Sequence, residues 1–390
     1  MHLIEKKINN TLQLRIYSSL IEIDEHSWNA IHPTIPFYQS YAFLSMIQNI
    51  QPTLEFRYVL VYKKEQLVAA LYFQLLDFSF KNLVNYSSEN QQKHGVKTSI
   101  KKYVSKKDTK LLNLGNVFFT GDNGIIANND AEIIEFLPDF FDAVSATFSQ
   151  KKPTASLLAN IYLKDEDKCI RFCDHAFHPF ITEPDMFMQV DENWHSMVDY
   201  MQSLSSKYRV RTKKIISTSA AIVKKEFTQE EIYIYKNEIY ALYDNVVNNV
   251  AFNMAMLDIS FFENVKKIYG NKCVVSGYFL DGVLVGFSCL FHVEIATLHV
   301  HYIGLNYDVN KEYKLYNRML LDFVEFAIDH KIKNIHFGRT ATEIKTTIGA
   351  KPTPLHAYLK MHNRLFNMVL PSFLKRIKPP EYEVRHPFKE

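Results

Sequence analysis

The chain has 390 residues, 47% of them hydrophobic and 22% charged, which is ordinary for a globular protein of two or three domains. Its 45 Lys and Arg nearly balance 42 Asp and Glu, and the net charge of +3 excludes a histone-like mode of nucleic-acid binding. We therefore expect no DNA partner, and any basic site must be local. Glycine is scarce, at 11 residues, and neither GxGxxG nor GxxxxGK[ST] occurs, which excludes the familiar phosphate-binding loops.

The sequence also bears on location. The N-terminal segment MHLIEKKINN has no apolar run behind its lysines, so we expect no secretory signal. The most hydrophobic region, residues 273–305, is interrupted by Asp281, His292 and Glu294, so we expect no membrane span. Four cysteines are too few for a disulfide framework in a chain of this length. These features predict a cytoplasmic, reduced protein.

Two segments of the chain resemble each other. Residues 56–73 and 273–291 each read as a strand, a polar turn and a second strand, and each follows a mainly helical stretch. When Tyr62 is aligned with Tyr278, the turns also align; they are Glu65-Gln66 and Asp281-Gly282. The pattern favours a duplicated α/β (α+β) unit with a mixed sheet over two unrelated hairpins.

Residues 179–193 predict a hinge between the two copies, dividing the chain into an N-terminal domain (residues 1–185) and a C-terminal domain with its tail (residues 186–390). Past the hinge we expect a helix from Trp194, a buried strand at 297–305, a helix at 315–328 and a strand at 334–338. The polar, lysine-rich segment 89–110 is expected to be a loop.

The densest basic cluster lies within SSKYRVRTKK and comprises Lys207, Arg209, Arg211, Lys213 and Lys214. No acidic residue occurs between Tyr200 and Lys225. Residues spaced by three and four share a helix face, and Arg makes bidentate contacts with phosphate. The cluster indicates a site for an anionic group, and a solvated helix face is the alternative.

The strand His299-Val300-His301-Tyr302 offers acid–base chemistry. Alternation predicts His299 and His301 on one face and Tyr302 on the other. A His titrates near neutral pH and can act as a general base towards an amine, and a Tyr can protonate a leaving group. The alternative is that both histidines are structural and bonded to neighbouring carbonyls.

A third candidate follows the strand that ends at Phe337. Gly338 allows a turn, and Arg339, several hydroxyls and Lys345 follow within FGRTATEIKTTIGA. Functional residues of open α/β sheets gather at strand ends, and this mixture suits an anionic cofactor or substrate. A surface turn without a ligand is the alternative.

The spacing Cys169-x3-Cys173-x-His175-x2-His178 invites a zinc interpretation. All four ligands would come from one short, strained loop, which differs from the usual separated ligand pairs. We therefore predict no metal ligands, and neither a catalytic-triad order nor HExxH is present.

Several of these segments resemble one family. The pattern W-x5-Y-x3-L-x2-K-x-R-x-R-x-K-K at residues 194–214 looks like the helix that opens the C-terminal half of FemABX-type transferases and related GNAT-superfamily acyltransferases. FGRTATEIKTTIGA resembles their closing motif, PFYQSYAFLSMI their entry helix, and LLNLGNVFFTGDNG a strand and loop of their relatives. The resemblance implies two tandem GNAT-like domains. The GNAT pyrophosphate loop is missing, because residues 306–313 contain no glycine.

The resemblance implies N-acyl or aminoacyl transfer from acyl-CoA, acyl-carrier protein or aminoacyl-tRNA to an amine of a lipid, amino acid or cell-envelope precursor, with no permanently bound cofactor. His301, or a water beside it, is the expected base and Tyr302 the alternative acid. Lys345 and Arg339 would neutralise phosphate or developing charge. The remaining expected residues contact the acyl donor through backbone amides (Val285, Gly286, Phe287) or bind substrate (Lys207, Arg209, Arg211, Tyr316, Asn317). The rival interpretation is a non-catalytic duplicated module that binds an anionic lipid or glycan intermediate.

The C-terminal segment MHNRLFNMVLPSFLKRIK, residues 361–378, has four basic residues and no acid. Large apolar residues beside basic ones are typical of helices that lie on membranes, so we predict peripheral contact with the inner membrane face. The alternative is a tail that packs across the domain pair, and Pro371 favours two short pieces.

Overall fold

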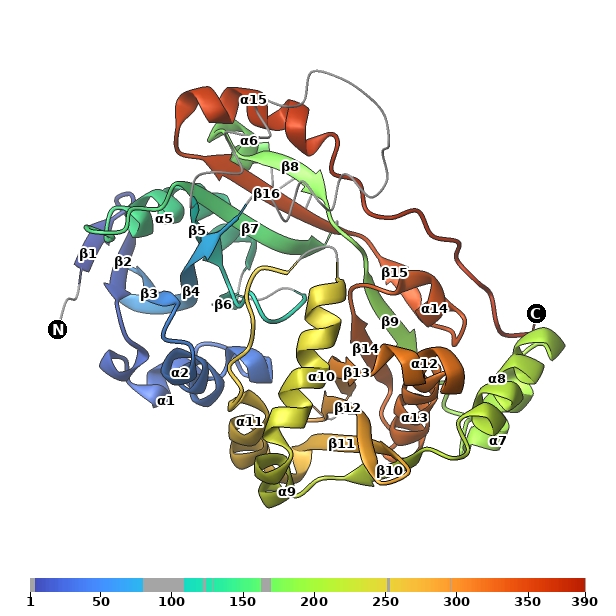
Figure 1. Ribbon diagram of the computed structural model, residues 1–390. Helices are drawn as coiled ribbons and strands as arrows, with labels where there is room; N and C mark the ends of the chain where they lie inside the picture. Colours follow the sequence, from blue (N-terminus) through green and yellow to red (C-terminus); the bar gives the residue numbers. More distant parts are fainter. Residues whose placement is uncertain are drawn as a thin grey trace. The chain divides into compact units, whose positions relative to one another are not determined.

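A computed structural model describes residues 4–79, 109–121, 124–128, 130–162, 170–250, 253–294 and 296–389 (Figure 1). The chain forms two compact units. The first comprises Met1–Glu183, Ala251–Leu257 and Pro354–Pro380. The second comprises Pro184–Val250, Asp258–Thr353 and Glu381–Glu390. The loop expected at residues 89–110 lies outside the described residues, except that Thr109 and Lys110 begin a strand.

The first unit is built on one mixed sheet. Its strands are β1 (Ile4–Lys7), β2 (Leu12–Tyr17), β3 (Glu55–Lys63), β4 (Gln66–Phe78), β5 (Thr109–Leu114), β6 (Ile125–Ala127), β7 (Ala155–Tyr162), β8 (His178–Ile181) and β16 (Leu355–Met361). They run in the order β1-β2-β3-β4-β5-β7-β16-β8, and β6 pairs with β4. Among the described strands of this sheet, only β5 and β7 pair in parallel.

Helices of the first unit cover this sheet with apolar side chains. They are α1 (Glu25–Asn29), α2 (Tyr41–Ile50), α5 (Asp130–Ser145), α6 (Ile170–Asp174) and α15 (Arg364–Leu374). In α5, residues spaced by three and four face the sheet, and Leu137, Phe141 and Val144 are fully buried with Leu71 and Phe73 of β4. The Ser40 hydroxyl accepts from the Phe43 amide and so caps the start of α2.

The second unit repeats the design. Its strands are β9 (Asp185–Gln189), β10 (Val223–Glu226), β11 (Cys273–Leu280), β12 (Val283–Phe291), β13 (Thr297–Leu305), β14 (Asn334–Gly338) and β15 (Lys351–Thr353). They run in the order β10-β11-β12-β13-β14-β9-β15, and only β13 and β14 pair in parallel. Its helices are α7 (Met197–Ser203), α8 (Ser206–Thr218), α9 (Gln229–Ile234), α10 (Lys236–Asn249), α11 (Phe261–Tyr269), α12 (Tyr307–Tyr313), α13 (Leu315–Asp329) and α14 (Thr342–Thr346).

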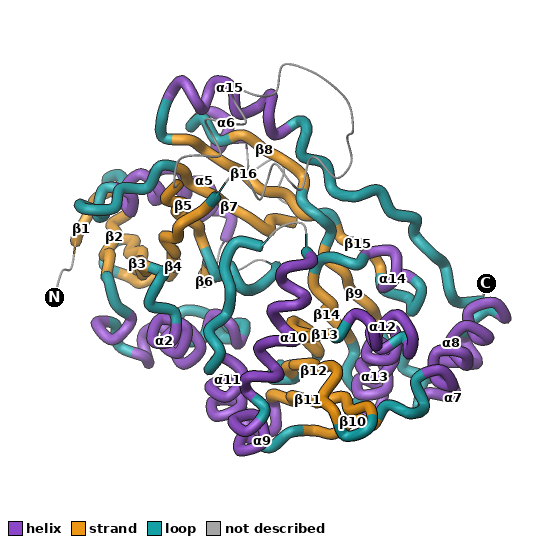
Figure 2. Tube along the Cα trace, viewed as in Figure 1, coloured by secondary structure: helices purple, strands orange, loops and turns teal. Residues whose placement is uncertain are grey.

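The two faces of the second sheet have different helical partners (Figure 2). On one face, Leu298 and Val300 of β13 pack in a core with Met319 and Leu320 of α13 and with residues of α7 and α8. On the other face, α10 and α11 supply aromatic rings, and Phe262 lies 4.9 Å from the Phe287 ring between centroids. The sheet is therefore buried on both sides, as a mixed sheet with a parallel pair requires.

The two sheets have equivalent strand orders, so the predicted duplication is confirmed. Each contains antiparallel strands, then one parallel pair, then two further antiparallel strands. The strands beyond each parallel pair are out of sequence order. β9 comes directly before β10 but pairs with β14 and β15, and β16 follows β15 but pairs with β7 and β8 of the first sheet. The strands of the second sheet, β9–β15, are consecutive in the chain, whereas the first sheet is completed by β16 from beyond them. The division at residue 185 stays a prediction for independently folding domains.

The repeated hairpins share a turn conformation. Lys64 and Glu65 have φ angles of 48° and 68°, and Asp281 and Gly282 have 50° and 78°. Two successive positive φ angles define the type I′ turn that matches strand twist. The equivalent turn is therefore Lys64-Glu65, one residue before the pair that the sequence alignment gives. In the first turn both positions carry a side chain, although a positive φ angle favours glycine.

We predict that Glu65→Gly raises the free energy of unfolding by about 0.5–1 kcal/mol, because it removes a Cβ from a left-handed position. Gly282→Ala at the equivalent place should lower it by a similar amount. Urea denaturation midpoints at constant m value measure both changes. Equal urea midpoints for the wild type and both variants would show that these left-handed positions do not strain a residue with a Cβ.

Candidate active site

Three histidines of the second unit meet where its parallel strand pair ends. The β13–β14 ladder stops at the pair His299 and His336, although β13 continues to Leu305 and β14 to Gly338. The ring centroids of His299, His301 and His336 are 5.3–5.5 Å apart. One ligand atom from each of these rings lies within 4.8 Å of the others. In the first unit, the equivalent β5 and β7 have the sequences TKLLNL and ASLLANIY and carry no titratable acid or histidine.

A β-bulge at His301 changes the predicted face of Tyr302. Cys289 pairs with Tyr302 and Leu290 with Val300, so His301 is the extra residue of β13. The Tyr302 ring lies 5.2 Å from Phe261 of α11 between centroids, and the His301 ring lies 6.5 Å from Phe291. Both therefore face α11. The expectation that Tyr302 points to the opposite face was wrong, because a bulge breaks the alternation.

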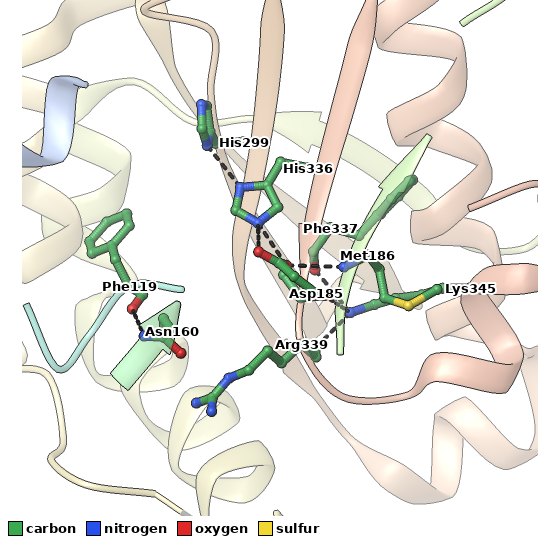
Figure 3. Close-up of polar contacts among 10 residues, drawn as sticks. Phe119, Asn160, Asp185, Met186, His299, His336, Phe337, Arg339 and Lys345 are labelled. Atoms are coloured by element: carbon green, nitrogen blue, oxygen red, sulfur yellow. Dashed lines mark hydrogen bonds and ion pairs between the residues drawn. The ribbon is translucent and has the colours of Figure 1, made fainter. Parts of the chain in front are cut away.

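Two carboxylates orient the imidazoles. Both Asp185 oxygens lie 2.7 Å from His336 Nε2, and the Asp185 side chain is fully buried (Figure 3). Glu294 Oε2 lies 3.3 Å from His299 Nε2. The Phe187 ring stacks on His336 at 4.5 Å between centroids. A charge-assisted bond on one nitrogen fixes the orientation of each ring and leaves its other nitrogen to face the cluster.

Burial sets the charge of this group. It lowers the pKa of His301 well below its usual range, and nearby His336, His299 and Lys345 lower it further. Burial also lowers the pKa of His299, against the opposing effect of Glu294. A buried imidazole avoids the desolvation cost of a charge by staying neutral. At neutral pH, His299 and His301 are therefore uncharged.

Lys345 organises the loop that follows β14. Its ammonium donates to the carbonyl oxygens of Phe337, Gly338 and Arg339 at 2.9, 3.0 and 2.7 Å. This loop contains three left-handed conformations within four residues, at Gly338, Thr340 and Ala341. Left-handed non-glycine residues are strained and persist only where neighbours hold them. The buried ammonium supplies that restraint, so Lys345 positions the loop carrying Arg339.

The structure brings only part of the predicted site together. Lys345 lies close enough to His301 to lower its pKa. Arg339 meets Lys345 through its backbone carbonyl, and in Figure 3 its half-buried side chain runs away from the Lys345 ammonium. Of the predicted site residues Lys345, Arg339 and His301, only the lysine and the histidine are thus close enough for their side chains to interact.

The residues expected to hold an acyl carbonyl lie in β12. Gly286 and Phe287 pair with β11 on one side and β13 on the other, and the Val285 carbonyl accepts from Asn306. A Cβ on Gly286 would approach Leu315 and Met319 to 2.8 Å, so glycine is needed there for packing of α13. The diverging strands are β13 and β14, not the strands around Val285.

The remaining predicted substrate residues lie elsewhere in the second unit. α8 buries Tyr208, Thr212 and Ile215 and packs on α12 and α13, on the sheet face opposite α11. The residues of α8 that lie outside this buried face include Lys207, Arg209, Arg211, Lys213 and Lys214. Tyr316 and Asn317 lie in the first turn of α13. The basic helix is therefore separate from the histidines.

Sequence reasoning missed the three partners of the predicted histidines, which are His336, Asp185 and Glu294. His336 was visible only as part of a strand, because the parallel register that sets it beside His299 is not encoded locally. Asp185 lies 151 positions from His336 in the sequence. Strand β9, the first of the second sheet in sequence, pairs with β14, and a sequence pattern does not reveal this pairing of distant strands.

The repeated unit, a mixed sheet whose single parallel pair ends early, defines a tandem GNAT fold. No family model matches the sequence, and no curated relative does. Among solved structures, FemX matches over 89% of this chain and 98% of its own, with 11% identity and a TM-score of 0.54. A tandem GNAT protein from the clavulanic acid biosynthesis pathway matches over 90% and 99%, with 8% identity and a TM-score of 0.54. The expected fold, tandem GNAT-like and FemX-like, is confirmed.

We predict that Lys345→Met lowers the free energy of unfolding by at least about 2 kcal/mol, because it leaves buried carbonyls without their charged donor. Lys351→Met, on an exposed position of β15, is the matched control and should be nearly neutral. Thermal unfolding of both variants measures the effect. Equal melting temperatures for the two variants would contradict the proposal that Lys345 holds the loop after β14 in place.

Proposed function

We propose that the protein is an acyltransferase that moves an acyl or aminoacyl group from an activated thioester or ester to an amine. One observation carries the proposal: a half-buried, neutral imidazole, His301, occupies a bulge beside the end of the parallel pair in a GNAT fold. Acyl-CoA, acyl-carrier protein and aminoacyl-tRNA are the candidate donors, and an amine of a lipid, amino acid or cell-envelope precursor is the acceptor.

The reaction needs alignment, one proton acceptor and one proton donor. The amine nitrogen attacks the donor carbonyl, and a C–N bond forms as the C–S or C–O bond breaks. His301, or a water beside it, takes the proton that the amine loses. The leaving thiolate or alkoxide takes a proton, for which Tyr302 is the nearest phenol on the same side of the sheet. Lys345, whose charge reaches His301 through space, supplies positive charge near the developing oxyanion.

The basic helix fits a binding role. The residues of the α8 basic cluster have no ion-pair partner among the described residues, and Lys207 lies over the Tyr208 ring. Cations without acidic neighbours are available for an anionic ligand, and Arg binds phosphate bidentately. We assign Lys207, Arg209 and Arg211 to an anionic part of the donor or acceptor.

The enzyme should form an N-acylated product when incubated with a donor panel and amine acceptors, as detected by mass spectrometry. His301→Gln should reduce kcat by about 10²–10⁴, the usual contribution of a general base. The double variant Arg209→Ala/Arg211→Ala should instead raise KM, because it removes charge-assisted contacts. His330→Gln, on the exposed end of α13, is the matched control.

Full activity of the His301→Gln variant would exclude His301 as the general base. No turnover with any donor, together with retained binding of anionic lipid or glycan, would favour the non-catalytic module.

The tail provides a second surface. α15 packs on β8 and β16 through Asn367, Leu370 and Leu374, and it exposes Leu365 (73%), Met368 (71%) and Val369 (48%). The exposed cations beside them are Arg364, Lys375, Arg376 and Lys378. No helix among the described residues is long and apolar enough to span a bilayer. An apolar strip with flanking cations suits the surface of an anionic membrane, and we propose that α15 binds the inner membrane face.

We predict that the protein co-sediments with anionic vesicles at low salt and less at high salt. Leu365→Glu/Met368→Glu should abolish co-sedimentation, and Ile21→Glu, another highly exposed apolar position of the first unit, should leave it unchanged. Truncation at Lys360 is unsuitable as a test of membrane binding, because it would remove the last residue of β16, which ends at Met361. Equal sedimentation of both variants would leave the tail a purely structural element.

A further inference from the structure

The hydrogen bonds around the histidine cluster determine where its lone pairs lie. A carboxylate only accepts hydrogen bonds, so the Nε2 atoms of His336 and His299, which face Asp185 and Glu294, both carry hydrogen. When both rings are in the neutral form, their Nδ1 atoms both carry lone pairs. These two Nδ1 atoms face each other at 3.2 Å.

Two lone pairs at this distance repel each other unless a cation lies between them. A shared proton is one solution and a metal ion is another. In a tetrahedral zinc site with Zn–N bonds of about 2.0–2.1 Å, two ligand nitrogens are roughly 3.3 Å apart. The observed Nδ1–Nδ1 separation of 3.2 Å is close to that value.

His301 supplies a third nitrogen. The three ring centroids form a nearly equilateral triangle with sides of 5.3–5.5 Å. Imidazoles on one tetrahedral zinc ion have centroids roughly 5.2 Å apart, given the same bond lengths. The most separated ligand atoms lie within 4.8 Å, so a closing movement of about 1.5 Å completes the set.

The surroundings have the form of a metal site. Asp185 on His336 and Glu294 on His299 are the carboxylate partners that commonly orient metal-bound histidines and strengthen them as ligands. Three imidazoles suit zinc and its neighbours in the first transition row and do not suit Mg²⁺ or Ca²⁺. The equivalent strands of the first unit carry no histidine, so the set belongs to the second unit alone.

We propose that His299, His301 and His336 bind one divalent transition-metal ion, with Zn²⁺ as the best match, held by Asp185 and Glu294 through the outer nitrogens. Three protein ligands leave one coordination position open. This inference goes beyond the proposed acyl transfer and does not depend on it. With the ion bound, the His301 lone pair is occupied, and the water beside His301 remains as the proton acceptor in that reaction.

The test is metal binding by the full-length protein without substrate. Chelator-treated protein is dialysed against Zn²⁺ and its metal content is measured. We expect one equivalent in wild type and a zinc-dependent rise in melting temperature, because the ion binds the folded state. His336→Gln should lose both, and Asp185→Asn should weaken binding about 10–100-fold. Cobalt substitution should give the visible absorption of a four-coordinate nitrogen site.

Two controls separate this site from others. His330→Gln and Cys173→Ser should keep the full equivalent; Cys173 is exposed and belongs to the Cys/His segment seen in the sequence. Wild type without bound zinc, or zinc retained by His336→Gln, overturns the proposal, and so does loss of zinc in Cys173→Ser. If His336→Gln does not fold, unchanged affinity in Asp185→Asn overturns it. Acyl-transfer assays are separate, so failure of either proposal leaves the other intact.

Discussion

The short parallel ladder between β13 and β14 is the constraint on which the second unit depends. It pairs His299 with His336 and then stops, while both strands continue. The bulge at His301 begins at the same place, where β13 pairs only with β12 in a shifted register. Parallel pairing must be buried, so the helices on both faces also enclose the polar residues at its end. Burial then lowers the pKa of His299 and of His301, so these two imidazoles are neutral at neutral pH.

The strand beside each parallel pair connects the architecture with the chemistry. β9 completes the second sheet beside β14, and it contributes Asp185, the carboxylate that orients His336. β16 fills the equivalent place beside β7 in the first sheet without adding a carboxylate, and its sequence is LHAYLKM. The two units therefore share a strand order and carry different side chains at the same structural position. Duplication supplied the scaffold twice, and the side chains at the end of the parallel pair distinguish the copies.

Lys345 has two roles, because it holds a loop in place and also affects the charge of His301. The sequence places a cation after a strand and a glycine, a pattern that indicates an anion site. In the structure, its ammonium holds the carbonyls of a loop with left-handed residues at Thr340 and Ala341. Its charge still acts on His301 through space, lowering the pKa of that imidazole. Loop geometry and site electrostatics are therefore coupled through one buried charge.

Local pattern determined much about this protein. Period-two runs and turn residues identified the hairpins at β3–β4 and β11–β12, because strand alternation and tight turns are properties of neighbouring residues. The spacing of Met197, Met201, Leu204 and Tyr208 indicated a helix after Trp194 for the same reason, and the structure divides that segment into α7 and α8. The pair His299 and His301 was recognised from one strand. The face of Tyr302 was not, since a bulge depends on the partner strand. Only the tertiary structure decided that His336, Asp185 and Glu294 join this pair, because parallel register and strand order are set by packing between segments far apart in the chain.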